Sequence, residues 1–295
     1  RLGLYPDAPK LPAVLGYEVS GTVERLGPGV TGFELGDSVL ALTRFGGHAD
    51  RAVANASTTF RLPPGMSLEE AAALPVNYFT AFHMVNRVGA LRSGEKVLIH
   101  AAAGGVGLAA IQLCRQVEGV EIFGTASAAK HPFLRAAGVD HPIDYRTQSY
   151  VNEVRRLTDG KGLHLVLDPL GGKDWDRGYH LLRPAGRMVV YGFSNLVNGT
   201  KRSLPHVLGQ LLSMRRFAPI ALMNDNRGVH GVNLGHLWGE EEMLREEAEA
   251  LLALYARGAI KPRVDRVFPL SRAAEAHRYV QERKNVGKVL FDCSA

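Results

Sequence analysis

The middle of the chain alternates short apolar runs with amphipathic segments, and glycine-containing turns separate them. The apolar runs lie at residues 97–99, 120–124, 143–145, 163–168 and 187–192. Runs of this length with few polar positions are typical of parallel strands that are covered on both faces. Segments with helical spacing follow at 106–113, 150–158 and 175–182. The alternation predicts a doubly wound parallel sheet of the α/β class.

The pattern is different before this region, where short alternating segments are broken by glycine. Residues 17–24, 36–42 and 49–53 fit the strands of an antiparallel β lobe. A helix is expected to begin after Ser67, because a serine followed three residues later by a glutamate is the signature of a capping box. A further helical stretch at 78–88 leads into the α/β region.

The last third of the chain contains one well-marked helix and two candidate strands. Residues 240–257 have acidic side chains first and a basic one last, with leucines on one face, which predicts an amphipathic helix. Residues 260–268 and 286–292 are expected to return and complete the β lobe. Residues 214–217 and 221–223 are expected to form a helix that borders a substrate cleft.

The strand at 97–99 runs through a glycine turn into a helix, and this is the most informative local feature. Gly104 and Gly105 keep side chains away from a phosphate, Gly107 allows close packing of helix and strand, and the first free amides of the helix face the anion. The residues expected to contact a dinucleotide here are Ala103, Gly104, Gly105, Val106 and Gly107. Ala102 stands where the dinucleotide motif has its first glycine, so a tight turn of another α/β protein is the alternative.

The end of the second strand carries no carboxylate. An NAD site usually places Asp or Glu about 20 residues after the glycines to bind the ribose 2'-hydroxyl, whereas hydroxyl side chains and a cation leave room for a 2'-phosphate. Ser127 and Lys130 occupy this position and favour NADPH. A capping serine and a solvated lysine are the alternative for either residue alone.

Two glycine-containing segments follow later strands of the predicted sheet. Residues 168–172 and 192–195 lie at carboxyl ends of strands, where ligands of such sheets bind. The residues expected to line the nicotinamide half of the cofactor are Asp168, Gly171, Gly192 and Phe193. A role in turn formation alone would explain these glycines as well.

Composition narrows the class of protein. The 295 residues exceed one typical core, and 46% of them are hydrophobic, so two lobes are expected. The net charge is +6, but the cations are scattered among acids, which does not favour nucleic acid as a partner. No apolar run reaches the roughly 20 residues of a membrane span. The two cysteines form neither a disulfide framework nor a metal motif, which predicts a reducing, cytoplasmic compartment.

Several motifs together resemble one family. These are Gly27-x-Gly29-Val30 with Phe33 and Gly36-Asp37-x-Val39, the turn at 102–107, the segment 168–172 and the closing segment 285–289. The chain is similar in them to the medium-chain dehydrogenase/reductase superfamily. Residues 124–131 and 141–145 look like its quinone oxidoreductase group, especially the vesicle amine transport protein-like branch.

The resemblance implies a Rossmann nucleotide domain and a GroES-like catalytic domain. We expect the catalytic domain at residues 1–82, the NADP-binding domain at 83–258 and a return to the catalytic domain at 259–295. The chain begins with Arg1 in a loop-like segment, so the first strands of the catalytic domain are expected to be missing.

The resemblance also implies chemistry without a metal. Zinc-dependent members carry Gly-His-Glu, and the matching residues here are Gly16, Tyr17 and Glu18. A phenol is a poor zinc ligand beside imidazole or thiolate, so we expect no metal site. The histidines without ligand spacing, expected to be surface or packing residues, include His48, His83, His100 and His131.

Hydride transfer from NADPH to a quinone or to the β-carbon of an α,β-unsaturated carbonyl is the activity that the resemblance implies. It places Tyr5 beside the nicotinamide as a hydrogen-bond donor, and Asn77 and Thr80 on the segment beneath it. Lys130 and Tyr145 match a pair at the 2'-phosphate. A loop role for Tyr5 and a strand-end role for Tyr145 are alternatives.

Asn285 matches a residue near the nicotinamide ribose, with a plain turn as the alternative. Nucleotide domains of the superfamily commonly pair edge to edge, so the resemblance implies a homodimer through an edge strand at residues 229–234. The vesicle-associated branch leaves a second function open, a nucleotide-binding interaction protein with little turnover.

Overall fold

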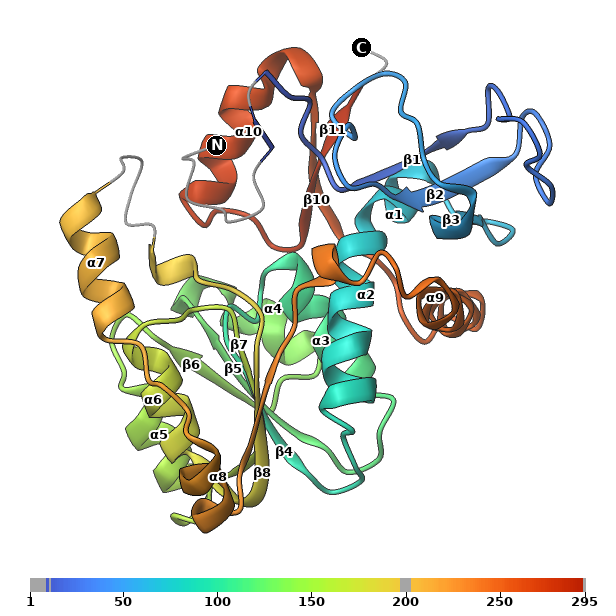
Figure 1. Ribbon diagram of the computed structural model, residues 1–295. Helices are drawn as coiled ribbons and strands as arrows, with labels where there is room; N and C mark the ends of the chain where they lie inside the picture. Colours follow the sequence, from blue (N-terminus) through green and yellow to red (C-terminus); the bar gives the residue numbers. More distant parts are fainter. Residues whose placement is uncertain (1–8, 11, 197–202, 294–295) are drawn as a thin grey trace. The chain divides into compact units, whose positions relative to one another are not determined.

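The computed structural model describes residues 9–10, 12–196 and 203–293 (Figure 1). The chain groups into two compact units, one formed by the chain up to Phe79 and again from Leu234, the other by Thr80–Asn233. Residues 234–258, assigned above to the nucleotide domain, therefore group with the first unit.

The second unit is built on a parallel sheet. Among the described residues its six strands are β4 (Lys96–Ile99), β5 (Glu121–Ala126), β6 (His141–Asp144), β7 (Leu163–Asp168), β8 (Leu182–Val190) and β9 (Gly228–Gly231). Their order is β6-β5-β4-β7-β8-β9, and every neighbouring pair is parallel. The predicted doubly wound sheet is confirmed. The order reverses between β4 and β7, which is where ligands of such sheets bind.

Helices connect these strands and cover the sheet (Figure 1). They are α3 (Gly105–Cys114), α4 (His131–Ala136), α5 (Tyr150–Leu157), α6 (Lys173–His180), α7 (Leu204–Leu212) and α8 (Pro219–Asp225), with short turns η3 (Ala128–Lys130) and η4 (Ser194–Leu196). The helix α2 (Pro75–Phe82) continues into a π-helical segment, η2 (His83–Val88). The expectation of a helix at 214–217 was wrong, because these residues connect α7 to α8.

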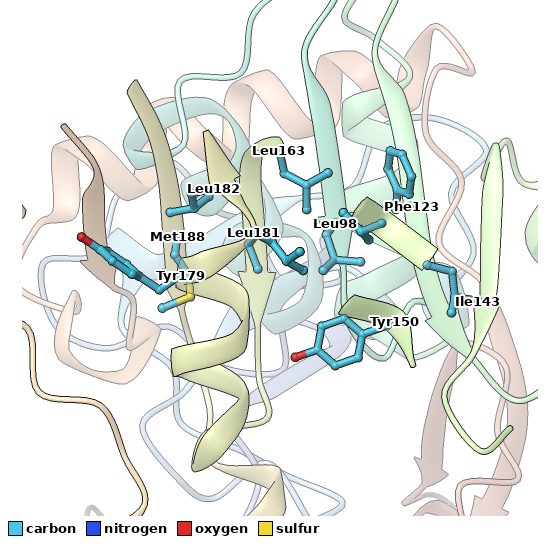
Figure 2. Close-up of a cluster of buried hydrophobic side chains, with 11 residues drawn as sticks. Leu98, Phe123, Ile143, Tyr150, Leu163, Tyr179, Leu181, Leu182 and Met188 are labelled. Atoms are coloured by element: carbon cyan, nitrogen blue, oxygen red, sulfur yellow. The ribbon is translucent and has the colours of Figure 1, made fainter. Parts of the chain in front are cut away.

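One core lies between the sheet and the helices α5 and α6 (Figure 2). Leu98 of β4 is aligned with Phe123 of β5 and Val166 of β7, so these side chains share one face. Val154 of α5 and Tyr179 of α6 belong to the same buried cluster. Alternate strand residues point to opposite faces, and Val97 and Ile99 on the other face are also fully buried. Burial on both faces explains why the strands read as apolar runs.

The first unit contains two small sheets. An antiparallel sheet is formed by β1 (Glu18–Thr22), β2 (Ser38–Leu42) and β3 (Thr59–Arg61). A parallel pair is formed by β10 (Val264–Pro269) and β11 (Lys288–Asp292). The helical segments are η1 (Ala56–Thr58), α1 (Leu68–Ala73), η5 (Leu234–His236), α9 (Glu241–Ala256), η6 (Leu270–Arg272) and α10 (Ala273–Gln281).

Two strand expectations for this unit need correction. Residues 49–53 form no strand, and Val53 there is 98% exposed, so no face of that segment is buried. The third strand is β3, whose Phe60 is aligned with Leu40. Within the described ranges β10 and β11 pair with each other and not with β1–β3. The antiparallel lobe itself and the capping box at Ser67 and Glu70 are confirmed.

Candidate cofactor site

The turn between β4 and α3 is held from the side by the neighbouring strand. The amide of Ala101 donates to the Thr125 hydroxyl at 3.2 Å, and the amide of Ala102 donates to the Thr125 carbonyl at 3.0 Å. The His100 ring contacts the same hydroxyl through Nδ1 at 3.1 Å. Ala101 adopts a positive φ of 51°, a conformation that needs such support. The turn is therefore fixed by β5 as well as by its own sequence.

Close packing requires glycine at position 107 of the turn and favours it at position 104. A Cβ on Gly107 would lie 2.6 Å from the carbonyl oxygens of Ala101 and Ala102, and one on Gly104 would lie 3.2 Å from the Ala101 oxygen. The first helical hydrogen bond runs from the Leu108 amide to the Gly104 carbonyl. The preceding amides of the helix have no acceptor within it, and they carry the positive end of the helix dipole. This arrangement suits the pyrophosphate of a dinucleotide.

The predicted 2'-phosphate residues follow two adjacent strands. Ala126 of β5 is aligned with Asp144 of β6, so Ser127 and Tyr145 emerge next to each other at the carboxyl edge of the sheet. Ser127 makes no side-chain cap to the helical turn that carries Lys130. Its hydroxyl is therefore not used as a helix cap, which was the alternative interpretation.

Sequence reasoning missed Arg146 at the same edge. Its guanidinium lies 6.0 Å from the centre of the Tyr145 ring. Its amide donates to the Asp144 carboxylate at 3.0 Å, and this hydrogen bond lowers the pKa of Asp144. The arginine directly after Tyr145 was a signal in the sequence, since guanidinium groups pair well with phosphate.

The segments after β7 and β8 are joined by backbone hydrogen bonds. The amide of Ser194 donates to the Pro169 carbonyl at 2.8 Å, and that of Asn195 to the Leu170 carbonyl at 2.9 Å. A Cβ on Gly192 would lie 3.0 Å from the Pro169 oxygen, so glycine permits this approach. Phe193 remains 45% exposed. The structure thus brings together the predicted residues of the two segments, and their contact with a cofactor stays a prediction.

Asp168 is fully buried and shapes its own loop. Its Oδ1 accepts from the amides of Leu170 at 2.5 Å and Gly171 at 3.1 Å, while its Oδ2 is buried and accepts no hydrogen bond within the described residues. Burial raises the pKa of Asp168. Burial lowers the pKa of His100, against the charges of Asp168 and Asp174. His100 is thus a packing histidine, and its ring stands edge-on to Tyr150 at 4.7 Å.

The remaining predicted residues lie elsewhere. Tyr5 falls outside the described residues. Asn77 and Thr80 are both buried in α2, and the Asn77 amide donates to the Ala73 carbonyl at 3.3 Å. Asn285 belongs to the first unit and donates to the Gly287 carbonyl at 2.8 Å, as a turn residue does. Their roles at a cofactor stay predictions.

The residues at the zinc-motif position do not fit a metal. Tyr17 packs its ring against Phe45 with centroids 4.9 Å apart. The Glu18 carboxylate accepts from the Val76 amide at 2.7 Å and pairs with Lys288, so it anchors the start of α2 to β11. No group of three or more His, Cys, Asp or Glu side chains in the described part of the chain could hold a metal ion.

Cys114 is buried inside the apolar helix α3. Burial raises the pKa of its thiol to about 12. A thiol with so high a pKa is not ionised near neutral pH and is no nucleophile.

Known families match both parts of the chain. Residues 1–80 match the alcohol dehydrogenase GroES-like domain, and residues 137–290 match the family described as zinc-binding dehydrogenase. The synaptic vesicle membrane protein VAT-1 homolog of Rattus norvegicus is 47% identical over 291 residues, which is 99% of this chain and 72% of that protein. The chain belongs to the medium-chain dehydrogenase/reductase superfamily.

Solved structures of the superfamily share this fold. The Escherichia coli quinone oxidoreductase complexed with NADPH matches with a TM-score of 0.84 and 30% identity, over 98% of this chain and 85% of that one. The CurK enoyl reductase matches with a TM-score of 0.80 and 28% identity, over 95% and 80% of the two chains. The Rossmann-like and GroES-like parts predicted from the sequence are confirmed.

A helix that spans a membrane needs about 20 predominantly apolar residues. In the described ranges no helix is both long and apolar enough to cross a bilayer.

Proposed function

We propose that this protein transfers hydride from NADPH to a quinone or to an α,β-unsaturated carbonyl compound, without zinc. The observation that carries the proposal is the glycine turn at the reversal of strand order, with Ser127 and Tyr145 beside each other on the same sheet edge. The NADPH complex of the similar quinone oxidoreductase supports it. NADPH supplies the hydride when it is bound.

The chain's own residues bind and orient the cofactor in this proposal. The first amides of α3 hold the pyrophosphate, and Ser127, Lys130 and Tyr145 hold the 2'-phosphate. The joined loops at 168–172 and 192–195 cover the nicotinamide and keep water away, which strengthens electrostatic interactions there.

Polar residues from both ends of the chain complete the proposed site on the substrate and nicotinamide side. The Tyr5 hydroxyl donates a hydrogen bond to the substrate oxygen that gains negative charge. Asn77 and Thr80 on α2, together with Asn285, position the nicotinamide and its ribose.

An assay of turnover tests the activity. Purified protein is mixed with NADPH and a panel of quinones and alkenals, and loss of the absorbance of the reduced cofactor is followed. Oxidation that depends on enzyme and acceptor is expected to persist in the presence of a zinc chelator. Oxidation that stops with the chelator contradicts the metal-free part, and absence of oxidation with every acceptor contradicts the activity.

The choice of cofactor is tested with Lys130→Ala. Removing this cation should weaken NADPH binding by about tenfold and NADH binding by less than about twofold, because only NADPH carries the 2'-phosphate. Arg92→Ala is the matched control, since Arg92 is exposed and lies before the opposite end of β4. Fluorescence titration measures the dissociation constants of NADPH and NADH for each variant. Equal weakening of the two cofactors would count against the assignment.

The names of the relatives favour one further candidate, a nucleotide-binding protein that acts by interaction at vesicles. The VAT-1 homologues are named as synaptic vesicle membrane proteins. NADPH binding without turnover in the assay above would favour this function. A cytoplasmic location and a homodimer are proposed with either function.

A further inference from the structure

A cavity of about 150 Å³ lies in the second unit at the amino-terminal ends of β7 and β8. It is formed by the turn between α5 and β7 and by the turn between α6 and β8. Gly162 in its wall directly precedes β7, whereas Asp168 ends this strand. Six strand residues span about 20 Å. The cavity is therefore separate from the proposed cofactor site at the opposite edge of the sheet.

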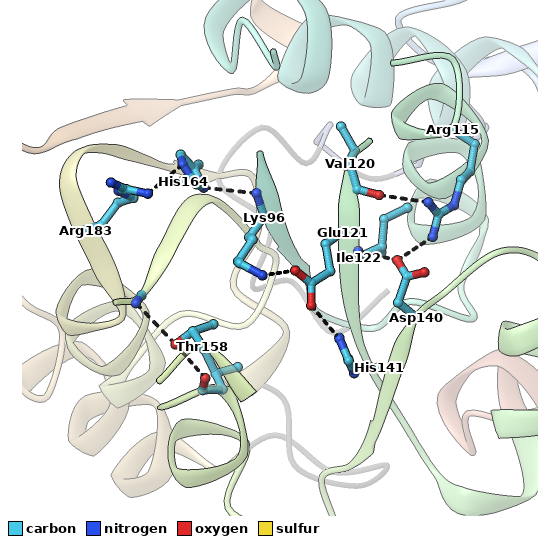
Figure 3. A network of polar contacts seen from close by, with 12 residues as sticks. Lys96, Arg115, Val120, Glu121, Ile122, Asp140, His141, Thr158, His164 and Arg183 are labelled. Atoms are coloured by element: carbon cyan, nitrogen blue, oxygen red, sulfur yellow. Dashed lines mark hydrogen bonds and ion pairs between the residues drawn. The ribbon is translucent and has the colours of Figure 1, made fainter. Parts of the chain in front are cut away.

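The lining of the cavity is strongly basic. Its cationic and titratable side chains are those of Arg155, Lys161, His180, Arg183 and Arg227, and no Asp or Glu lines it. Arg155 and Lys161 are exposed and form no ion pair with any described residue. The Arg183 guanidinium contacts His164 Nε2 at 3.0 Å, which does not neutralise it (Figure 3).

The negative ends of two helices offset only part of this positive charge. The helices α5 and α6 both end beside the cavity, and each C-terminus acts as about half a negative charge. Together they offset about one of the four arginine and lysine charges. The Asp176 carboxylate lies 3.5 Å from His180 and compensates that side chain when it is protonated. A surplus of positive charge remains in the cavity.

Arg227 lines the same cavity and stacks on an aromatic ring. Its Nε is buried and donates to no described residue, although its guanidinium lies 5.2 Å from the centre of the Tyr179 ring. The Nε atom therefore does not face the cavity, and Arg227 contributes its positive charge to the lining.

The backbone around the cavity is held firmly and uses its own donors. The Thr158 hydroxyl donates to the Val154 carbonyl at 2.8 Å and accepts from the Gly162 amide at 3.2 Å (Figure 3). The Lys161 amide donates to the Thr158 carbonyl at 2.9 Å. With these amides occupied, the side chains of the lining provide the recognition of a ligand.

We propose that this basic cavity binds a phosphate group, either as free phosphate or as the phosphomonoester of a larger ligand. Phosphate offers several acceptor oxygens at one charged centre, and arginine and lysine are the side chains that pair best with it. The cavity has room for one such group with its water.

NMR titration with inorganic phosphate tests the proposal, first without and then with saturating NADPH. The amide signals of Gly160, Lys161 and Gly162 report on the cavity, while those of residues 104–107 report on the glycine turn. Signals at 160–162 should shift whether or not NADPH is present. Failure of the proposed NADPH function would leave this result unchanged.

Variants separate specific binding from general attraction. The pair Arg155→Gln and Lys161→Gln, made together, should weaken phosphate binding on the order of tenfold. Arg92→Gln with Arg216→Gln removes the same charge at exposed positions outside the cavity and should leave the affinity within about twofold. The proposal is overturned if signals at 160–162 do not move, or if the two double variants weaken binding equally.

A second experiment distinguishes a lipid headgroup from a soluble phosphate ligand. Phosphatidylcholine vesicles with and without phosphatidic acid are sedimented with the protein. Sedimentation that requires phosphatidic acid, and is lost in the cavity variant only, assigns the group to a lipid headgroup. Phosphate-induced shifts without sedimentation assign it to a soluble ligand.

Discussion

Gly107 shows how a single atom controls the candidate cofactor site. Replacement by alanine would place a Cβ 2.6 Å from two backbone oxygens, which cannot move without changing the turn. We expect Gly107→Ala to weaken NADPH binding by about tenfold or more, a loss of roughly 1.4 kcal/mol. Isothermal titration calorimetry measures the affinity.

Gly209→Ala is the matched control. Gly209 lies within α7, and a Cβ there meets no atom within 4 Å. Since alanine is the better helix former, this variant should keep its NADPH affinity and gain up to about 1 kcal/mol in stability. Unchanged NADPH affinity in Gly107→Ala would show that the turn does not hold the pyrophosphate.

His100 provides a second prediction for a single side chain. Because burial lowers its pKa from the usual 6.5, the ring should stay neutral as the pH falls through 6.5. The stability that neutral His100 contributes is present above that pH and is lost as the pH falls further. NMR of the labelled imidazole measures its protonation, and a midpoint at or above 6.5 would contradict the prediction.

The sequence predicts only some of the residue contacts at the candidate cofactor site. The glycines of the turn were recognisable because each has a local reason to be glycine. The support from Thr125 was not, since it depends on two strands lying side by side, and Thr125 is 25 residues from His100. The sequence likewise did not indicate that Asp168 binds the backbone of its own loop.

Among the elements, the start of β4 is held to β8 by a largely buried ion pair. Arg187 contacts Glu95 through both terminal nitrogens, at 2.8 and 2.5 Å, with both side chains only 13% exposed. Arg187 also donates to the carbonyls of Gly89 and Ala90. One side chain thus ties the end of the η2 segment to the sheet.

Breaking this pair should be costly. Glu95→Gln leaves the Arg187 charge buried without a carboxylate, and we expect a loss of about 3 kcal/mol in the free energy of unfolding. Glu153→Gln is the control, because its pair with Arg156 at 2.7 Å is on the surface and is worth at most about 0.5 kcal/mol. Urea unfolding measures both variants. Equal losses would show that the buried pair has no special role.

The same pair predicts a dependence on pH. Burial raises the pKa of Glu95, but the hydrogen bonds from Arg187 and from the Arg92 amide, together with the charge of Arg187, outweigh it, so the pKa lies below its ordinary value of 4.5. The stabilisation is therefore complete above pH 4.5 and is lost as the pH falls below it. The stability difference between wild type and Glu95→Gln should shrink over this range. A constant difference would contradict the assignment.

The type of most elements could be predicted, whereas pairing outside the main sheet could not. Strands β4, β5 and β7 are apolar at consecutive positions because both faces are buried, and this gives a clear signal. The parallel pairing of β10 with β11 depends on side chains far away in the sequence. The sequence of residues 260–268 alone does not show whether this strand pairs with β11 or adds to the antiparallel sheet.

For the whole molecule, the edge strand β9 makes the proposed dimer testable. The Val232 amide donates to the Val190 carbonyl at 2.9 Å. Successive amides of a strand point to opposite sides, so the Gly231 amide points away from β8.

Gly231→Pro should abolish a dimer built on this edge without removing a hydrogen bond to β8. Sedimentation velocity measures the mass, with Gly231→Ala as control. A proline variant that stays dimeric would exclude this edge.

The first unit is assembled from both ends of the described chain, and this has a consequence for biosynthesis. Lys288 of β11 pairs with Glu18 of β1 across 270 residues. The ribosome releases Glu18 long before Lys288 exists, while the whole parallel sheet emerges between them. The Rossmann-like unit can therefore mature on the nascent chain, and the GroES-like unit must wait until its last strands have been synthesised. A stop codon shortly before Lys288 would leave the unit of the parallel sheet intact and the first unit without β11.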